Sequence, residues 1–504
     1  MKLTTADEVP LPDAAYTADQ VAELDRLASA AGLPGLQLMK RAGRAAFELL
    51  LTRFAKPDSI VVYCGGGNNG GDGYVVAGLA AQRRLDVRVV ELAAPEKLSG
   101  EAASARQFAV QEGVPMSPLN GADLPSEGVV VDALLGIGAR GRVRGAYADA
   151  IQQINNSGLP VLALDIPSGL HPDTGVVLGT AVRANLTVTF IGLKQGLLTG
   201  RGAEQCGQLI FADLGVPDDI YDQVQPSATR LSSSQFLNAL PRRTRHAHKG
   251  DFGHVMVIGG DMGYGGAAII AAQAALRSGA GMVSLATRPE HVSAALSRCP
   301  ELMVCGVTSG QELEPWLARP SVLVIGPGLG RSAWSEQMLQ QAMATDLPMV
   351  VDADALNIIA EGRMAPPPVR DHWLLTPHPG EAARLLGCNT AEIEVDRFTA
   401  VRTLRERWGG TALLKGAGTL ISSAGHLPGV VTGGNPGMAS GGMGDLLSGI
   451  LGGLVAQGLS LPEAAHLGAC VHAEAGDLAA AEQGERGLLA TDLLPLLPLF
   501  LEAQ

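Results

Sequence analysis

Short apolar runs alternate with helix-like stretches along the first half of the chain. The runs are "SIVVYC" (59–64), "VRVVEL" (87–92), "GVVVDALLG" (128–136), "PVLALDIPSG" (160–169) and "LTVTFIG" (186–192). Between them lie "YVVAGLAAQRR" (74–84) and "AYADAIQQINN" (146–156), which read as helices. Buried apolar strands separated by helices are typical of a parallel sheet covered on both faces, so we predict a Rossmann-like α/β domain.

A helical segment is predicted before the first of these strands. Thr17 and Gln20 stand directly ahead of the helix-like stretch "VAELDRLASA" (21–30). Their spacing is that of a capping box, in which each side chain accepts a hydrogen bond from the other residue's backbone N–H. We therefore expect a helix to begin at this point.

The alternation stops between about residues 214 and 247, where Pro, Ser and charged residues dominate. We place a domain boundary here and predict one domain over 1–225 and a second over 226–504. The second half resumes the rhythm in "GHVMVIGG" (253–260), "GMVSLAT" (281–287), "SVLVIGPGLG" (321–330), "PMVVDADAL" (348–356), "HWLLTPHPGE" (372–381) and "TALLKGAGTLI" (411–421). The halves share a rhythm but no motif, so they are not internal repeats.

Composition and charge favour small-molecule ligands. A chain of 504 residues is too long for one ordinary core, and its 65 glycines are scattered through loops, which excludes collagen-like and flexible-linker sequences. A net charge of −13 argues against nucleic acid, which would require a basic face. We interpret the basic run "RRTRHAHK" (242–249) as a solvated linker that helps to orient phosphates rather than as a nucleic-acid arm.

The cysteines and the amino terminus indicate a cytoplasmic protein. The six cysteines show no C-x-x-C spacing and the ten histidines form no H-E-x-x-H motif, so neither zinc nor a disulfide framework is indicated. The first residues, "MKLTTADEVPLPDAAY", carry acids and prolines where a secretory signal has an apolar core. No apolar run reaches membrane-spanning length, so we expect no membrane partner.

The loop "GGGNNGGDG" (65–73) follows the first strand and fits the dinucleotide motif G-x-G-x-x-G through Gly65, Gly67 and Gly70. Glu91 follows at about the distance of a ribose-binding acid. One feature opposes that interpretation, because Asp72 stands where we expect the next helix to open. An aspartate there would cap the helix and repel a phosphate, so the loop alone leaves a structural cap and a ligand site both open.

Oxygen-bearing side chains gather at other strand ends. Asp132 ends "VVVD" and Asp165 ends "LALD", and the carboxyl ends of neighbouring parallel strands are where α/β proteins bind ligands. With Asn68, Asn69 and Ser168 they form a set suited to a hard cation and a polar ring. Either aspartate alone would more often cap a loop, but the combination favours a site.

Four motifs in the first half together resemble the epimerase domain of bifunctional NAD(P)H-hydrate repair enzymes. They are "GGGNNGGDG" (65–73), "DALLGIGARGR" (132–142), "LDIPSGL" (164–170) and "TFIGLKQG" (189–196). The resemblance implies that this domain epimerises nicotinamide nucleotides carrying water at ring C6, the hydrates NADHX and NADPHX. The loop would then hold a nicotinamide nucleotide as substrate rather than as redox cofactor.

The resemblance also assigns residues in this half. It implies substrate contacts by Asn68, Asn69, Gly70, Gly71, Asp72, Gly136, Ile137, Gly138, Ala139, Arg140, Gly141, Arg142 and Asp165, and binding of K⁺ by Asn69, Asp132 and Ser168. From its chemistry, Asp165 is a candidate proton carrier for reversible ring opening or water loss at C6. Lys194 follows another strand and could neutralise phosphate, although a surface lysine is the simpler interpretation.

The stretch "NPGMASGGMGDLLSGILGGL" (435–454) carries the strongest chemical signal. Small residues let backbone N–H groups surround an anion, and a helix beginning near Asp445 directs its positive end at the same point. An acid in that place can take the proton of a hydroxyl that attacks phosphorus. The alternative is that Asp445 is an ordinary helix cap.

This stretch resembles the G-x-G-D signature of ribokinase-like enzymes, and further motifs resemble the ADP-dependent dehydratase domain of the same repair family. These motifs are "HKGDFGHVMVIGG" (248–260), "GYGGAAIIAAQAALRSGAGMV" (263–283), "GPGLGR" (326–331), "DADALN" (352–357), "TPHPGEAARLL" (376–386) and "LLKGAGTLI" (413–421). The resemblance implies a ribokinase-like α/β fold for the second domain, with ADP and Mg²⁺ bound together.

The same resemblance assigns residues in the second half. It implies nucleotide binding by Lys415, Gly416, Ala417, Gly418, Thr419 and Gly444, and substrate contacts by Ala267, Gly328, His378 and Asp445. Ala268 and Gly330 are alternatives to Ala267 and Gly328. Asp445 is also the expected catalytic base, whereas a lone histidine such as His378 is more often structural.

Two other functions stay open at this stage. The second half could be a small-molecule kinase, which would release a stable phosphorylated product. The first half could be a non-catalytic nucleotide sensor or a partner-binding module. We also expect a homo-oligomer.

Overall fold

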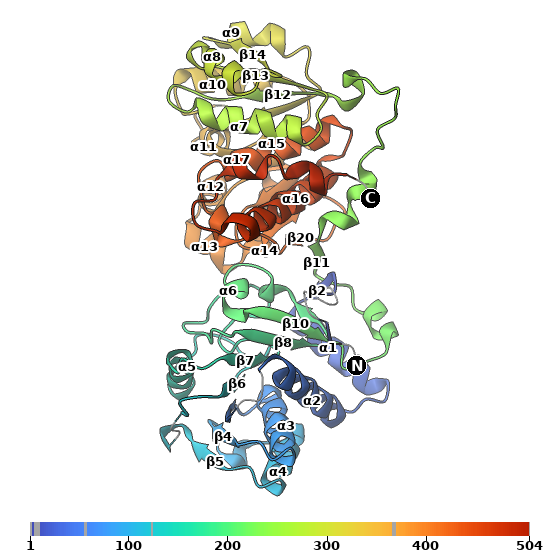
Figure 1. Cartoon of the computed structure of the whole chain (residues 1–504), viewed down its shortest axis with the longest axis vertical. Coiled ribbons are helices and arrows are strands. Elements are labelled where there is room, and N and C mark those ends of the chain that lie inside the picture. Colours follow the sequence, from blue (N-terminus) through green and yellow to red (C-terminus); the bar gives the residue numbers. More distant parts are fainter. Residues whose placement is uncertain (1–2, 5–10, 55–57, 122–123, 365–368, 503–504) are drawn as a thin grey trace. The chain divides into compact units, whose positions relative to one another are not determined.

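The computed structural model describes residues 3–4, 11–54, 58–121, 124–364 and 369–502. Residues 1–2 and 5–10, on which part of the signal-peptide interpretation depends, lie outside the described residues. The chain divides into two compact units, Met1–Thr229 and Arg230–Gln504 (Figure 1). Among the described residues, no helix combines the length and apolar character needed to cross a bilayer.

Unit 1 is built on a mostly parallel sheet with the strand order β1-β10-β8-β7-β6-β3-β4-β5. Only β1 runs antiparallel to its neighbour. The strands of this sheet are β1 (Leu3–Thr4), β3 (Ile60–Cys64), β4 (Val87–Glu91), β5 (Met116–Pro118), β6 (Val129–Ala133), β7 (Val161–Leu164), β8 (Leu186–Phe190) and β10 (Gln208–Ala212). Strands β4 and β5 are added on one side of β3, and β6 and the later strands of this sheet on the other. The switch point between β3 and β6 is where such folds bind ligands.

The helices of unit 1 are α1 (Ala18–Ala30), α2 (Gly35–Arg53), α3 (Asn68–Gln82), α4 (Gly100–Gln111), α5 (Ala146–Asn156) and α6 (Gly202–Cys206). The predicted capping box is confirmed, since Thr17 N donates to Gln20 Oε1 (2.8 Å) and Gln20 N donates to Thr17 Oγ1 (3.3 Å). Three short strands, β2 (Ala14–Tyr16), β9 (Leu193–Lys194) and β11 (Ala228–Leu231), pair with one another in the order β11-β2-β9.

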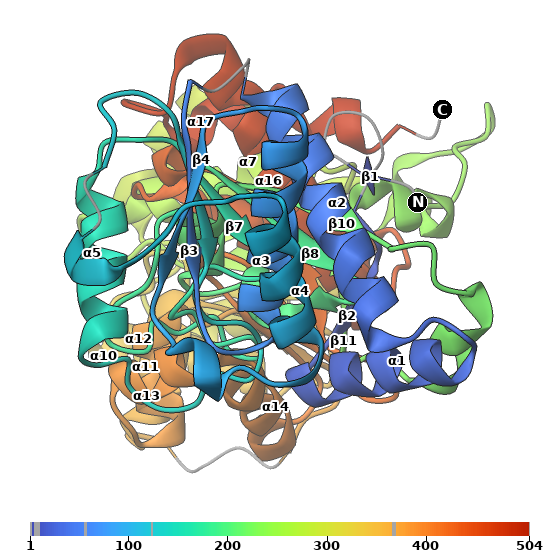
Figure 2. The same ribbon diagram turned by 90° about the horizontal axis from the view of Figure 1, so that it is seen from below.

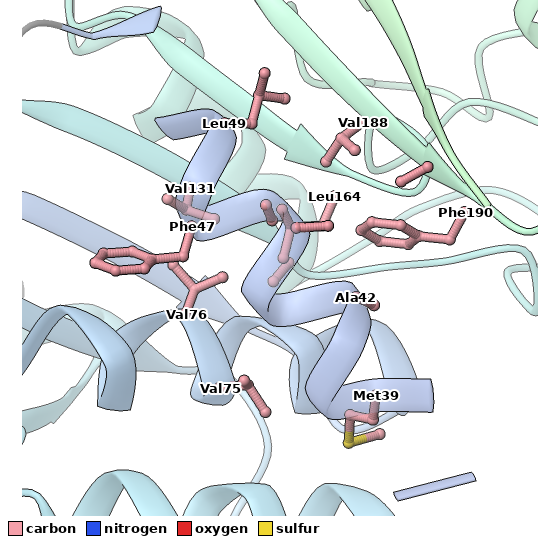
Figure 3. Packing of buried hydrophobic residues seen from close by; sticks show 14 of the residues in the cluster. Met39, Ala42, Phe47, Leu49, Val75, Val76, Val131, Leu164, Val188 and Phe190 are labelled. Carbon is pink, nitrogen blue, oxygen red and sulfur yellow. The ribbon is translucent and has the colours of Figure 1, made fainter. Parts of the chain in front are cut away.

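Both faces of the sheet of unit 1 are covered by helices, as the continuous apolar runs predict. Helices α2, α3 and α4 lie on one side of the strands, and α5 lies on the other (Figure 2). Along β3, Ile60 and Val62 belong to the core formed with α2, α3 and α4, whereas Val61 and Tyr63 belong to the core formed with α5. On the first face α2 lies close to α3 and to the strand ends (Figure 3). A Cβ on Gly43 of α2 would lie 2.5 Å from the side chain of Val75, so the two helices pack in close contact.

Unit 2 has a second parallel sheet, which confirms the predicted α/β class. Its strands follow the order β14-β13-β12-β15-β16-β17-β18-β19-β20, and the last two join antiparallel. They are β12 (His254–Ile258), β13 (Met282–Thr287), β14 (Met303–Gly306), β15 (Val322–Ile325), β16 (Met349–Val351), β17 (Trp373–Leu375), β18 (Thr411–Leu414), β19 (Thr419–Ser422) and β20 (Gly429–Val431). The chain changes direction across this sheet between β12 and β15.

The helices of unit 2 are α7 (Gly265–Arg277), α8 (Val292–Arg298), α9 (Gly310–Leu313), α10 (Ala333–Met343), α11 (Ala353–Ala360), α12 (Pro379–Leu386), α13 (Thr390–Val395), α14 (Arg397–Trp408), α15 (Met443–Ala456), α16 (Leu461–Gln483) and α17 (Ala490–Leu493). Helices α7, α15 and α16 share one apolar core with the strands, and α7 and α15 lie side by side (Figure 1). A Cβ on Gly449 of α15 would lie 2.0 Å from Ala271 O, so a small residue is needed at this crossing.

Candidate active sites

The glycine loop after β3 differs from its prediction at one point. Helix α3 begins at Asn68, inside the glycine motif, with Gly67 as N-cap and no capping side chain. The expectation that Asp72 stands at the helix start is therefore wrong: Asp72 lies inside α3 and is buried. The first turn follows β3 so closely because a chain of glycines lets the backbone turn without steric conflict.

Two glycines of the motif serve this close packing. A Cβ on Gly65 would lie 1.8 Å from Leu134 O, and one on Gly70 would lie 2.1 Å from Gly65 O. Glu91 also has a structural role, since it accepts hydrogen bonds from Tyr74 Oη (2.8 Å) and Arg106 Nε (2.6 Å). With its carboxylate bound by the protein, Glu91 does not act as the ribose acid of a dinucleotide cofactor site.

Gly65→Ala should destabilise unit 1 by about 1–3 kcal/mol or more, because the new methyl group overlaps a backbone carbonyl that cannot move aside. Gly67→Ala is the matched control, since no atom lies within 4 Å of a Cβ there. Urea unfolding followed by far-ultraviolet circular dichroism measures both. An equal effect of the two substitutions would contradict the packing role of Gly65.

A cavity of about 860 Å³ opens at the carboxyl ends of β3, β6 and β7. Of the residues predicted to bind substrate, it is lined by Asn68, Asn69, Asp72, Gly136, Ile137, Gly138, Ala139 and Asp165. The others lie outside its lining. In the first turn of α3, Gly70 packs against Gly65 and Gly71 against Met39, while Arg140 donates to Ile137 O (2.8 Å) and Arg142 packs beside Gly179.

Asp165 lies directly after β7 with a left-handed backbone, at φ = 64°. Such a conformation is uncommon for a residue with a side chain and is found at functional sites. Its Oδ1 is ion-paired with Lys194 Nζ and accepts a hydrogen bond from Phe190 N (3.2 Å). Within the described part of the chain Oδ2 has no hydrogen-bond partner, so one oxygen of Asp165 is free to meet a ligand in the cavity.

Lys194 is fully buried, so its interpretation as a surface lysine is wrong. Besides Asp165, its ammonium donates to Thr189 Oγ1 (3.1 Å) and Phe190 O (2.9 Å). These three acceptors match its three N–H groups. Lys194 therefore holds the carboxylate of Asp165 in place and has no donor left for a phosphate.

Asp132, Ser168 and Asn69 form a second polar cluster beside this cavity. Asp132 is fully buried at the end of β6 and accepts from Ser168 Oγ (2.6 Å) and Ser168 N (2.8 Å). Burial raises the pKa of Asp132 to about 6 even though Ser168 and Leu134 donate to it. Asn69 donates to Leu135 O (3.0 Å), but its Oδ1 is buried without a partner. Among the residues that the structure describes, the cluster thus contains a buried carboxylate that is hydrogen-bonded but has no cation beside it, and an amide oxygen that has no hydrogen-bond donor.

In unit 2, Asp352 and Lys415 form the centre of the candidate site. Asp352 follows β16 and is almost completely buried, and its Oδ1 lies 2.7 Å from Lys415 Nζ, which follows β18. Thr376 donates to Oδ1 (2.8 Å) and Ser448 of α15 donates to Oδ2 (2.7 Å). Although burial favours the neutral amine, Asp352 and Glu381 raise the pKa of Lys415. Lys415 is therefore a fixed positive charge at the strand ends.

Asp445 lies in the first turn of α15, as predicted, at the positive end of that helix. Burial, Asp352 and Asp354 raise the pKa of Asp445 to about 6, against the opposing effect of Lys415. A Cβ on the neighbouring Gly444 would lie 3.2 Å from Lys415 Nζ, so the loop, the helix start and the lysine meet at one point. A base with a pKa near neutrality is suited to proton transfer.

His378 has the structural role that a lone histidine more often has. It is the N-cap of α12, and its Nδ1 accepts from Gly380 N (3.0 Å) and Glu381 N (3.4 Å). Its Nε2 lies 3.3 Å from Glu381 Oε1. Burial raises the pKa of Glu381 to about 7 despite Lys415. The side chain of His378 is half exposed beside the buried Glu381, so a ligand can still reach it.

The remaining predicted residues of unit 2 lie near the same sheet edge, on loops, in the first turn of α7 (Ala267) and at the start of β19 (Thr419). A Cβ on Gly328 would lie 3.1 Å from Ala267 Cβ, so these two residues are neighbours, whereas Ala268 is fully buried. Gly330 N donates to Asp354 Oδ2 (2.9 Å), which connects this loop to the surroundings of Asp445. Gly416, Ala417 and Gly418 form the turn between β18 and β19, and Thr419 Oγ1 donates to Gly416 O (3.0 Å).

Several acidic residues of these sites were not predicted individually. Asp352, Asp354 and Glu381 lie in quoted motifs. Asp352 directly follows a strand, so the argument from strand ends that identified Asp132 and Asp165 could have identified it too. Asp25 lines the cavity of unit 1 from α1, and burial raises its pKa to about 6. Its helix carries several acids, so no local pattern marks Asp25 as the one that faces a ligand.

Comparison with known proteins covers both units. Residues 35–196 match the family model of the YjeF-related protein N-terminus, and residues 255–499 match that of NAD(P)H-hydrate dehydratase. Unit 2 is also similar to the crystal structure of a ribokinase-like superfamily protein from Enterococcus faecalis. That likeness has a TM-score of 0.50 and 31% sequence identity, and it covers 55% of this chain and 95% of the other.

Two relatives match almost the whole chain. The bifunctional NAD(P)H-hydrate repair enzyme Nnr of Coxiella burnetii is 49% identical over 480 residues, which cover 95% of this chain and 98% of the relative. The enzyme of the same name from Escherichia coli is 43% identical over 490 residues, covering 97% of this chain and 94% of the relative. The chain therefore belongs to the family of bifunctional NAD(P)H-hydrate repair enzymes.

Proposed function

We propose that unit 1 interconverts the R and S epimers of NADHX and NADPHX, and that unit 2 dehydrates the S epimer to NADH or NADPH at the expense of ADP. The observation that carries this proposal is a reactive carboxylate at the carboxyl edge of each sheet: Asp165 in the cavity of unit 1 and Asp445 beside Lys415 in unit 2. Hydration of NADH yields both epimers, so a chain with both activities repairs all of the damaged nucleotide.

In unit 1, the reaction centre is C6 of the hydrated ring. We assign the proton transfer to Asp165, whose free Oδ2 faces the cavity while Lys194 and Phe190 hold Oδ1. Asn68, Asn69, Asp72 and the loop from Gly136 to Arg142 would bind the rest of the nucleotide. The open amino terminus of α3, with Gly67 as its cap, suits an anionic phosphate.

The polar cluster of unit 1 fits a potassium ion. The unpaired Asn69 Oδ1, the buried carboxylate of Asp132 and the hydroxyl of Ser168 are oxygen donors, which hard cations prefer. When bound, K⁺ would supply positive charge that offsets the buried carboxylate and fixes the loop carrying Gly136. We propose Asn69, Asp132 and Ser168 as its side-chain ligands.

Potassium should raise the melting temperature of unit 1 relative to tetramethylammonium at equal ionic strength, because it would bind the folded cluster and not the unfolded chain. Asp132→Asn should remove this difference. Melting followed by circular dichroism in the two chloride salts measures the effect. Equal melting temperatures for the unsubstituted chain would exclude the potassium site.

In unit 2, we assign phosphoryl transfer followed by elimination. Asp445 takes the proton of the C6 hydroxyl, and the oxygen attacks the β-phosphorus of ADP, so that AMP leaves. The C6–O bond then breaks with its electron pair as phosphate departs, while the nitrogen lone pair forms a C=N bond. Loss of the C5 proton restores the lone pair and gives the dihydronicotinamide. Phosphate leaves far more readily than hydroxide, which explains the need for ADP.

The surroundings of Asp445 fit ADP and Mg²⁺. Asp352, Glu381 and Asp445 lie around one lysine and Asp354 lies near Asp445, so this site has surplus negative charge that a divalent cation would offset. Asp352 and Glu381 would hold Mg²⁺, which screens the charges of the transferring phosphoryl group. Lys415, Gly416, Ala417, Gly418, Thr419 and Gly444 would bind the nucleotide, and Ala267, Gly328 and His378 the hydrated nicotinamide.

The dehydratase rate should rise with pH, reach half of its plateau near pH 6 and level off above about pH 7. Asp445 accepts a proton only when ionised, and its raised pKa of about 6 means that the active fraction falls as pH drops below that value. At pH 5 we expect kcat/KM of about a tenth of its plateau. Initial rates of NADH formation between pH 5 and 8 measure this. A rate independent of pH in that range would exclude Asp445 as the titrating base.

Incubation of purified S-NADHX with the chain and either ADP or ATP tests the proposed function. Absorbance of the reduced nicotinamide should return with ADP, with one phosphate and one AMP formed per NADH. A small-molecule kinase would instead give a stable phosphorylated product without that absorbance. Unchanged S-NADHX under both conditions would refute the dehydratase proposal.

We also propose that the protein is cytoplasmic and that it forms a homo-oligomer. All six cysteines are free in the described structure, which suits a reducing cytoplasm. The homo-oligomer stays a prediction that light scattering of the purified chain would check.

A further inference from the structure

Three carboxylates besides Asp165 line the cavity of unit 1: Glu101 of α4, Asp25, midway along α1, and Asp72 in α3. Within the described ranges neither Asp25 nor Asp72 accepts a hydrogen bond from the protein. Buried carboxylates without a donor are unfavourable unless they hold a proton or meet a ligand. Both therefore belong to the chemistry of the cavity rather than to the packing of the fold.

The positive charge nearby does not balance these acids. The ammonium group of Lys194 lies beside these acids, but it donates all of its N–H groups to Asp165, Thr189 and Phe190. Arg26 also lines the cavity but pairs with Glu23 on its own helix, and Glu101 adds a further acid. Burial raises the pKa of Asp25 to about 6 and that of Asp72 well above its ordinary value, and Asp165 adds to both effects.

Epimerisation by water loss is best served by two proton carriers, because the hydroxyl leaves from one face of C6 and the new water adds to the other face. In the water-loss route, an acid gives a proton to the C6 hydroxyl, and the C6–O bond breaks as the nitrogen lone pair forms a C=N bond. A water molecule then adds to the other face of C6, the lone pair returns to nitrogen, and a base takes the proton of that water. Water and proton balance over the cycle, but one group gives a proton and another takes one.

We infer that Asp25 is the second proton carrier of the epimerase site and acts together with Asp165. This inference rests on the epimerisation proposed above. Asp165, with Oδ1 held by Lys194 and Phe190, takes the proton of the returning water through Oδ2. Asp25 reaches the cavity from a helix outside the sheet, whereas Asp165 lies at the end of β7. Asp72 is the more deeply buried of the two, and burial raises its pKa; we leave it the role of a substrate contact.

Asp25→Asn and Asp25→Ala in the full chain test this inference, with Asp222→Asn as control. Asp222 belongs to the same unit, is exposed and lies outside the lining of the cavity. Interconversion of R- and S-NADHX is followed by chromatography. We expect the interconversion rate of both Asp25 variants to fall about 100-fold and that of the control to stay unchanged. Formate should restore the rate of Asp25→Ala, because it can occupy the space left by the side chain and carry the proton.

The outcomes separate the two proposals. If the unsubstituted chain does not interconvert the epimers, the proposed function of unit 1 fails. If the unsubstituted chain interconverts the epimers and Asp25→Asn does so at the same rate, Asp25 carries no proton. The same conclusion follows if Asp25→Ala is slow and formate does not accelerate it. Circular dichroism and the dehydratase rate of each variant report whether both units are folded.

Discussion

Asp445→Asn lowers the rate of ADP-dependent NADH formation about 100- to 10,000-fold, the usual contribution of a positioned general base. The amide keeps the size of the side chain at the start of α15 but cannot take the proton of the C6 hydroxyl. Binding of ADP should change little, because Lys415 and Asp352 keep their ion pair. Initial rates with S-NADHX and ADP measure the loss.

Asp346→Asn is the matched control for this substitution. It makes the same chemical change in unit 2, at a side chain that is 97% exposed. Its dehydratase rate should equal that of the unsubstituted chain. Asp445→Asn should also retain epimer interconversion, which belongs to unit 1. A dehydratase rate within a few-fold of normal in Asp445→Asn would mean that Asp445 is a helix cap and not the base.

Lys194→Met should unfold unit 1 at lower denaturant concentration, with a loss of about 3–5 kcal/mol, and should abolish epimerisation. Methionine fills a similar volume but removes the ammonium that offsets the charge of Asp165 and that donates to Thr189 and Phe190. The side chain of Lys194 is 1% exposed, so water does not replace the lost contacts. All four tryptophans lie in unit 2, so circular dichroism reports on both units and fluorescence on unit 2 alone.

The double variant Lys194→Met/Asp165→Asn separates charge from packing. It removes both charges, so it should recover much of the lost stability, because an unpaired buried charge costs more than a neutral pair. It should stay inactive as an epimerase. If Lys194→Met alone unfolded like the unsubstituted chain, the ion pair would not be a structural element of the site.

The sequence predicted the strands well because their apolar runs are continuous. "SIVVYC" becomes β3, and every residue of β3 and β6 is buried between two layers of helices. The strand-end rule then found Asp132 and Asp165, because a parallel sheet brings its carboxyl ends to one edge. Asp445 was found through the glycines before it, and the structure places it at the start of α15.

What the sequence could not predict depends on contacts between distant residues. The start of α3 at Asn68 depends on how closely Gly65 packs against Leu134, which no local pattern reports. Lys194 resembles a surface lysine until Asp165 and Thr189 are seen around it. Asp25 is one of several acids on α1, and only the fold shows that it faces the cavity.

The most direct test of the central claim uses pure R-NADHX with ADP and three preparations: the unsubstituted chain, Asp165→Asn and Asp445→Asn. We predict rapid NADH formation by the unsubstituted chain and slow or no formation by either variant. A mixture of the two variants should restore it, since each supplies the unit that the other lacks. Rapid NADH formation from R-NADHX by Asp165→Asn alone would contradict the account.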